Sequence, residues 1–143
     1  SIIAGTTGAD GKYVAAAGKP HKRVISTQVA AEMRQILESV TTNEGTAPAA
    51  RIPGYRIAGK TGTANRSNGN GGYAGAGYTA SFVGMVPADH PKLVCEVVLD
   101  RPLHDYYGGE AAAPVFHTVM SFALQTLGIA PTFSKAPKAT LTW

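Results

Sequence analysis

The stretch Ile57-Ala58-Gly59-Lys60-Thr61-Gly62-Thr63-Ala64 decides the fold, because its residues fit two incompatible structures. With Gly54 it satisfies the phosphate-loop pattern G-x-x-x-x-G-K-[ST]. The same residues also form a strand of small side chains that carries a Lys-Thr-Gly triplet. A phosphate loop must be followed by a helix, whose N-terminal amides hold the phosphates. The neighbouring sequence therefore distinguishes the two structures.

The residues around Lys60 argue against a phosphate loop. No apolar helical period occurs between Thr61 and Tyr78, where the helix would have to begin. Residues 55–57 are bulky for a loop that wraps a phosphate, and Asp100 is the only aspartate that could end a strand as a metal ligand. The sequence predicts a strand over residues 55–64.

Side chains on such a strand alternate between its two faces. Lys60 and Gly62 would share one face, and Thr61 and Thr63 the other. A twisted edge strand can still direct all of these side chains around one cleft, and Gly62 leaves room for the backbone of a ligand. The alternative for the triplet alone is an exposed lysine on a strand rich in glycine and threonine.

Two further strands follow along the chain, over residues 80–86 and 93–99. The glycine-rich loop 65–77 precedes the first, and a turn at 87–91 separates the two. At the start of the chain, turn residues predict a hairpin or two short strands around residues 2–4 and 13–16. Consecutive strands with short connections favour antiparallel pairing.

Two helices flank these strands in the sequence. The first is predicted over residues 26–40, with Ser26 as its N-cap. The second is predicted over residues 114–127, with Pro114 in its first turn and Gly128 just past its end, before an irregular tail at 129–143. The apolar stripe of the first helix comprises Val29, Met33, Ile36, Leu37 and Val40, and that of the second Phe116, Val119, Met120, Ala123 and Leu127. The pattern predicts an α+β fold, an antiparallel sheet flanked by helices.

The composition is that of a globular piece with low surface charge. Of the 143 residues, 44% are hydrophobic and 15% charged, against about 25% charged in a typical domain, which fits a piece partly covered by other protein. The net charge of +4 is scattered; the one basic cluster, Lys19, Lys22 and Arg23, lacks flanking aromatic residues, so no nucleic-acid partner is expected. Cys95 is the only cysteine and is expected to be a small core residue. No stretch approaches the length of a membrane span, and we expect the chain to be a fragment.

An ordered series of short motifs surrounds Lys60. Glu44-Gly45-Thr46-Ala47 and Ile52-Pro53-Gly54-Tyr55 precede it, and Ser81-Phe82-Val83-Gly84, Val86-Pro87-Ala88, Tyr107-Gly108-Gly109 and Ala113-Pro114-Val115-Phe116 follow it. Over nearly the whole chain this series resembles class B penicillin-binding proteins, in particular the septal, cell-division type of actinobacteria. The resemblance implies that residues 1–143 are the C-terminal part of one transpeptidase domain, with a partial penicillin-binding or β-lactamase-like fold.

In that family a serine attacks the penultimate D-alanine carbonyl of a peptidoglycan stem peptide, and a second stem resolves the acyl-enzyme into a cross-link. β-Lactams acylate the same serine. No serine of this chain has a lysine three residues later, so the S-x-x-K motif is missing, and so is S-x-N. The resemblance places both motifs upstream of Ser1, and the chain alone is expected to be inactive.

The resemblance assigns roles to the motif that remains. Lys60 would supply positive charge for proton transfer, and the backbone N–H of Thr63 would be one of two oxyanion donors. The hydroxyls of Thr61 and Thr63 would bind the carboxylate of the substrate or β-lactam, because a cation and two hydroxyl donors are suited to an anionic group. Gly62 would allow close approach of the ligand. The expected catalytic residues are thus Lys60 and Thr63, and the substrate-binding residues Thr61, Gly62, Thr63 and Tyr107.

In the family an aromatic residue before the Gly-Gly pair walls the pocket, which points to Tyr107, or to Tyr106; either could instead be a core aromatic. His104, Asp105 and His117 have no matching partner for acid–base work or ligation and are expected to be surface or core residues. No cofactor or metal is expected.

The resemblance also implies the setting of the protein. Its partners would be a stem peptide or β-lactam, the N-terminal part of the same protein, and membrane proteins of the division machinery. The expected location is the extracytoplasmic face of the bacterial membrane, with an N-terminal anchor outside this chain. Two alternatives remain open: a β-lactamase-like or D,D-carboxypeptidase-like hydrolase, and a non-enzymatic β-lactam sensor.

Overall fold

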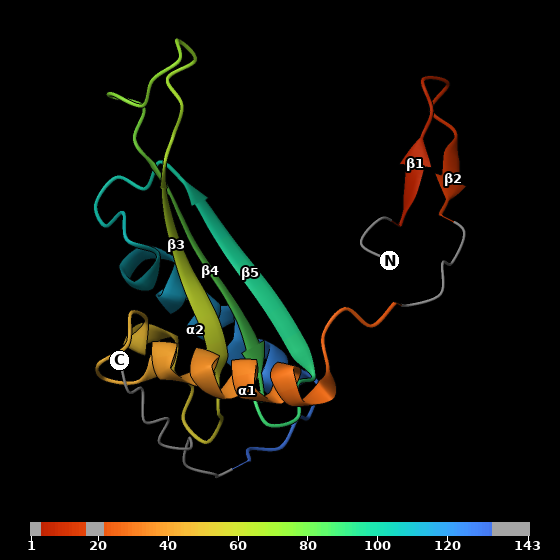
Figure 1. Cartoon of the computed structure of the whole chain (residues 1–143), viewed down its shortest axis with the longest axis vertical. Coiled ribbons are helices and arrows are strands. Elements are labelled where there is room, and N and C mark those ends of the chain that lie inside the picture. Colours follow the sequence, from red (N-terminus) through yellow and green to blue (C-terminus); the bar gives the residue numbers. More distant parts are fainter. Residues whose placement is uncertain (1–3, 17–21, 133–143) are drawn as a thin grey trace. The chain divides into compact units, whose positions relative to one another are not determined.

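A computed structural model of the chain describes residues 4–16 and 22–132. The chain divides into two compact units, residues 1–30 and 31–143, each of which is described by itself (Figure 1). The first unit holds the hairpin of β1 (Gly5–Thr7) and β2 (Tyr13–Ala15), which pair antiparallel. The second strand lies where it was predicted; the first lies after the predicted residues 2–4, of which residues 2 and 3 are outside the described ranges.

The second unit is built on three antiparallel strands in the order β3–β4–β5. These are β3 (Ala58–Asn65), β4 (Tyr78–Val86) and β5 (Leu93–Asp100). Within the described residues β3 pairs only with β4, so it lies at an edge of the sheet. The predicted antiparallel order is confirmed, although β3 begins three residues later than expected because residues 52–55 form a turn closed by a hydrogen bond from Tyr55 N–H to the Ile52 carbonyl, 3.1 Å.

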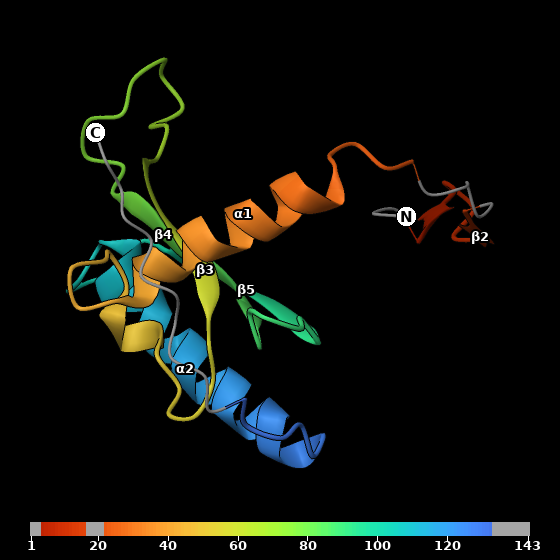
Figure 2. The same cartoon turned by 60° about the horizontal axis from the view of Figure 1, so that its bottom comes forward.

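One face of this sheet packs on α2 (Gly108–Thr126), which lies behind the strands in Figure 1 and below them in Figure 2. Phe82 of β4 and Phe116 of α2 are fully buried, and their rings meet edge to face at 4.9 Å between centroids. Gly84 is required here, because a Cβ on it would lie 2.8 Å from the Phe116 ring. The predicted α+β fold, an antiparallel sheet with helices, is thus confirmed, and α2 is the helix that packs on the sheet.

α2 begins six residues earlier than predicted. Tyr107 is its N-cap, and the Tyr107 carbonyl accepts from the N–H groups of Glu110 and Ala111 at 3.0 and 2.9 Å. Pro114 therefore lies inside the helix, not in its first turn, where the general preference of proline had placed it. The C-terminal prediction is confirmed: Gly128 has φ of +62°, and Ile129 N–H and Gly128 N–H bond the Leu124 and Gln125 carbonyls in a Schellman motif.

The apolar stripe predicted for α2 is correct only in part. Phe116 and Met120 are buried, but Val119 is 47% and Leu127 61% exposed. The helix instead buries Ala112, Ala113 and Leu124, because its earlier start places the two alanines inside the helix, where they join the core.

α1 (Thr27–Glu38) confirms the first predicted helix, which ends two residues early and continues as a 3-10 turn, Ser39–Thr41. Ser26 caps it as predicted, its hydroxyl accepting from Val29 N–H at 3.1 Å. The predicted apolar stripe is buried only at its C-terminal end. Val40 packs against the core, whereas Met33 and Ile36 are 44% and 45% exposed.

Candidate active site

The Lys-Thr-Gly-Thr segment lies in the middle of β3, whose other edge is unpaired within the described residues. Lys60 is therefore not at the N-terminus of a helix, and the phosphate-loop structure is excluded. Lys60 is exposed, and its ammonium donates to the Thr61 carbonyl at 2.8 Å. The cation thus lies along the open edge of the strand.

The two threonines face α2. In the antiparallel ladder Thr61 and Thr63 lie opposite Phe82 and Ala80 of β4, which are buried. The two threonines therefore share the face of the sheet that α2 covers, as the alternation of side chains along a strand requires. Lys60 pairs with Val83 on the opposite face. Because the Lys60 ammonium and the threonine hydroxyls lie on opposite faces of the sheet, a single ligand can contact both only if it lies along the edge of β3.

The hydroxyl of Thr63 is held by the start of α2. Gly108 N–H donates to Thr63 Oγ1 at 3.1 Å. Since that contact uses the oxygen as an acceptor, the hydroxyl hydrogen is left to donate. Thr61 Oγ1 lies 3.1 Å from Thr46 Oγ1, where one hydroxyl donates and the other keeps its hydrogen for another partner. Both pairs can therefore present O–H donors to an anion, beside the positive end of the α2 dipole.

Glycines make this close approach possible. A Cβ on Gly108 would collide with the Ser81 carbonyl and lie 2.6 Å from the Gly62 carbonyl, and a Cβ on Gly109 would collide with the Thr46 carbonyl. Both glycines are buried. On Gly62 a Cβ would collide with Ser81 Oγ, so this glycine also serves the packing of β3 on β4.

A row of tyrosines extends from the start of α2. Tyr107 is 53% exposed, and Tyr106 donates to its hydroxyl at 3.3 Å. That donated hydrogen bond raises the pKa of Tyr106, because it stabilises the neutral phenol. Tyr106 also stacks on Tyr78 of β4 with ring centroids 4.4 Å apart. Tyr107 and Tyr106 are thus both in the row, which continues to β4.

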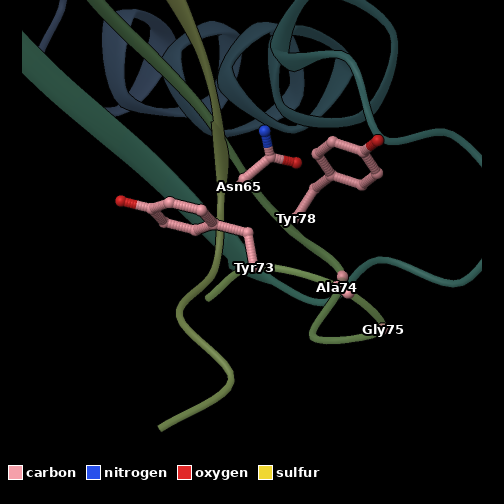
Figure 3. Close-up of a pocket in the computed structure, with 6 residues that line it drawn as sticks. Asn65, Tyr73, Ala74, Gly75 and Tyr78 are labelled. Atoms are coloured by element: carbon pink, nitrogen blue, oxygen red, sulfur yellow. The ribbon is translucent and has the colours of Figure 1, made fainter. Parts of the chain in front are cut away.

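The row ends at an open hollow of about 530 Å³, lined by Asn65, Tyr73, Ala74, Gly75, Gly77 and Tyr78 (Figure 3). The hollow lies between the end of β3, the start of β4 and the loop that joins them. Within that loop Asn68 Oδ1 accepts from the N–H groups of Asn70 and Gly72 at 2.9 and 3.1 Å. These bonds give the first half of the loop a defined turn.

Sequence reasoning missed Thr46, Ser81 and Tyr78 as parts of this site. Thr46 and Tyr78 lie 15 and 17 residues from Thr61, and only the folded chain brings them close. Of the three, only Tyr78 could have been suspected from the sequence, because it is an aromatic residue that directly follows a glycine-rich loop at the start of a strand.

The remaining candidates do not join the site. His117 Nδ1 contacts the Arg51 carbonyl, as a structural histidine would. Over residues 4–16 and 22–132, no three His, Cys, Asp or Glu side chains are placed to hold a metal ion. In the same ranges no helix has the length and apolar character that a membrane span needs.

Comparison with known proteins identifies the class. The family model of the penicillin-binding protein transpeptidase domain matches residues 3–121. The chain belongs to this family.

Among curated relatives, the chain is 40% identical over 111 residues to probable peptidoglycan D,D-transpeptidase PbpC of Pseudomonas aeruginosa, covering 77% of this chain and 20% of that protein. It is 38% identical over 133 residues to penicillin-binding protein PbpB of Mycobacterium tuberculosis, covering 87% of this chain and 20% of that one. The resemblance to class B penicillin-binding proteins is confirmed, and the chain spans about a fifth of these relatives.

Solved structures agree. Penicillin-binding protein 3 of Mycobacterium tuberculosis in complex with ampicillin superposes with a TM-score of 0.75 at 34% identity, covering 94% of this chain and 32% of that one. The apo transpeptidase domain of Burkholderia pseudomallei penicillin-binding protein 3 gives 0.70 at 37% identity, covering 90% and 37%.

Proposed function

We propose that this chain is the Lys-Thr-Gly-bearing part of a peptidoglycan D,D-transpeptidase that cross-links stem peptides through a serine acyl-enzyme and is acylated by β-lactams. The observation that carries the proposal is the placement of residues 60–63 on β3, an edge strand of the sheet, with Thr63 bonded to the start of α2. Family membership supports it.

In this proposal the substrate peptide lies along β3 with its carboxylate toward the threonines. The free hydrogens of the Thr61 and Thr63 hydroxyl pairs donate to that carboxylate, which is a charge-assisted contact. The Thr63 N–H donates to the oxyanion of the tetrahedral intermediate. Lys60 provides positive charge where the attacking serine loses its proton. Tyr107 and Tyr106 wall the side of the pocket.

We propose that the serine and its lysine lie in an N-terminal part of the same domain, outside residues 1–143. The sheet offers a surface for that part. On the face away from α2, Val94 is 69% and Val98 56% exposed, and within the described residues the second edge of β5 is unpaired. Apolar side chains beside a free strand edge favour burial against more protein.

The proposed setting is the extracytoplasmic face of the membrane, because the cross-linked stem peptides lie there. Membrane proteins of the division machinery are the proposed further partners. The mycobacterial relative is named a penicillin-binding protein, and a related solved structure holds ampicillin. These two findings about other proteins support a β-lactam as a ligand here.

The test is covalent labelling of the complete protein by a fluorescent penicillin. We expect stoichiometric label that unlabelled ampicillin blocks, on a serine outside residues 1–143, and transfer of the acyl group to an added amine. Absence of label would contradict the proposal. Rapid hydrolysis of the acyl-enzyme would favour a hydrolase, and a stable acyl-enzyme without transfer would favour a sensor.

A further inference from the structure

A buried ion pair lies at the entrance of β3. Arg56 donates to Glu38 through both Nε and Nη2, at 2.7 and 2.6 Å. The side chains are only 17% and 3% exposed. Glu38 is the last residue of α1, and Arg56 stands two residues before β3. A planar guanidinium that meets a carboxylate with two parallel bonds fixes orientation as well as distance.

Thr41 and Ala88 hold the same point of the chain through hydrogen bonds to backbone carbonyls. Thr41 Oγ1 lies 3.1 Å from the Glu38 carbonyl and 3.2 Å from the Ile57 carbonyl, and its hydroxyl hydrogen can be donated to either. Ala88 N–H donates to the Arg56 carbonyl at 2.8 Å. The end of α1, the entrance of β3 and the turn after β4 therefore meet at this pair. Asp89 in that turn adds further negative potential at Arg56, and the pKa of Arg56 is raised chiefly by its hydrogen bond to Glu38.

The other end of the Lys-Thr-Gly-Thr segment has separate anchors. Thr61 is held by Thr46, and Thr63 by Gly108. Lys60 lies between the two groups of anchors, and within residues 4–16 and 22–132 its ammonium donates only to the carbonyl of Thr61. A shift at Arg56 would therefore move Lys60 more than it moves the carboxylate-binding hydroxyls.

The energetics favour a positioning role. Removing two charges from water costs free energy that their attraction regains only in part, and buried pairs can often be replaced by apolar residues without loss of stability. What an apolar pair cannot supply is the fixed angle of a bidentate contact. We propose that Glu38 and Arg56 are positioning residues that set the place of Lys60 for acylation. The inference rests on the proposed transpeptidase function.

The experiment uses the complete protein and separates the dissociation constant of the noncovalent β-lactam complex from the acylation rate constant, by rapid mixing. In Glu38→Gln we expect the acylation rate constant to fall about tenfold to 100-fold, the range that a displacement of ~1 Å produces. The dissociation constant should stay within about twofold, since the threonine anchors are intact. The matched control is Asp100→Asn, which breaks the exposed Arg66–Asp100 pair at the far end of β3 and should leave both constants within about twofold.

A second variant separates positioning from stability. Glu38→Gln with Arg56→Met removes both buried charges, and its midpoint of thermal unfolding should equal or exceed that of Glu38→Gln. Its acylation rate constant should nevertheless remain as low as that of the single variant. Wild-type acylation by the double variant, or by a folded Glu38→Gln, would overturn the positioning role. A wild-type protein that takes no β-lactam at all would instead refute the proposed function.

Discussion

At the scale of single residues, Thr63 carries two functions that a substitution can separate. Its hydroxyl is proposed to bind the carboxylate, and its N–H the oxyanion. Thr63→Ala keeps the backbone N–H and removes the hydroxyl together with the γ-methyl, and losing a hydrogen bond to a charged group costs about 1.5–3 kcal/mol. We expect the second-order rate of β-lactam acylation of the complete protein to fall roughly ten- to 150-fold. Thr63→Ser, which restores the hydroxyl, should recover most of that loss.

Lys60 should be the more sensitive residue of the same strand. Lys60→Ala removes the only cation of the Lys-Thr-Gly-Thr segment and with it the proposed support of proton transfer. We expect a larger decrease in acylation rate than for Thr63→Ala, with an unchanged melting temperature because the side chain is exposed. If both variants are folded and acylate at the wild-type rate, the strand is structural and the proposed site is wrong.

At the scale of elements, the contact between α2 and the strands depends on glycine. Gly108→Ala places a Cβ against the carbonyls of Ser81 and Gly62, which are backbone atoms and cannot move aside singly. We expect a loss of about 1–3 kcal/mol in the free energy of unfolding, measured by denaturant titration. Gly72→Ala is the matched control, because its Cβ would meet only the flexible Asn68 side chain at 3.3 Å; its effect should be within about 0.5 kcal/mol. Equal stability of the two variants would contradict this account.

The elements also show what a sequence can predict here. Alternation and turn residues located β4, β5 and the strand that carries Lys60, because each pattern is local. The start of α2 was wrong by six residues, since Pro114 was interpreted as part of its first turn. The first two positions of the helix are glycines because the backbone of Ser81, Gly62 and Thr46 leaves no room for side chains there. Such a requirement depends on residues far away in sequence and cannot be detected in a local pattern.

The same limit applies to the candidate site. Lys60, Thr61, Gly62 and Thr63 were found through a contiguous motif. Thr46 was not, although its hydroxyl pairs with that of Thr61 at 3.1 Å. The exposed half of the α1 stripe, Met33 and Ile36, illustrates the reverse case: apolar periodicity predicts a buried face, and the described chain does not contain what would bury it.

At the scale of the whole molecule, the uncovered sheet face makes a prediction about the complete protein. Val98 is 56% exposed in this chain, and we propose that the rest of the domain buries it. Val98→Asp should then destabilise the complete protein by at least about 2 kcal/mol, because apolar burial is lost and a carboxylate is desolvated. Leu103→Asp, at a position that is 92% exposed outside the strands, is the control and should have little effect. Equal melting temperatures would mean that this face remains open.

The last prediction concerns the division of the chemistry between parts of the protein. Residues 1–143 contain the binding strand but no serine with a lysine three positions later, and hence no nucleophile of the S-x-x-K type. We expect the isolated chain to remain unlabelled by fluorescent penicillin at concentrations that label the complete protein fully. Lys60→Ala in the complete protein should slow labelling without moving the labelled serine, because Lys60 assists the reaction and does not form the bond. Mass spectrometry of the acylated peptide decides the matter: a labelled serine within residues 1–143 would show that this chain supplies the nucleophile and that the proposed division is wrong.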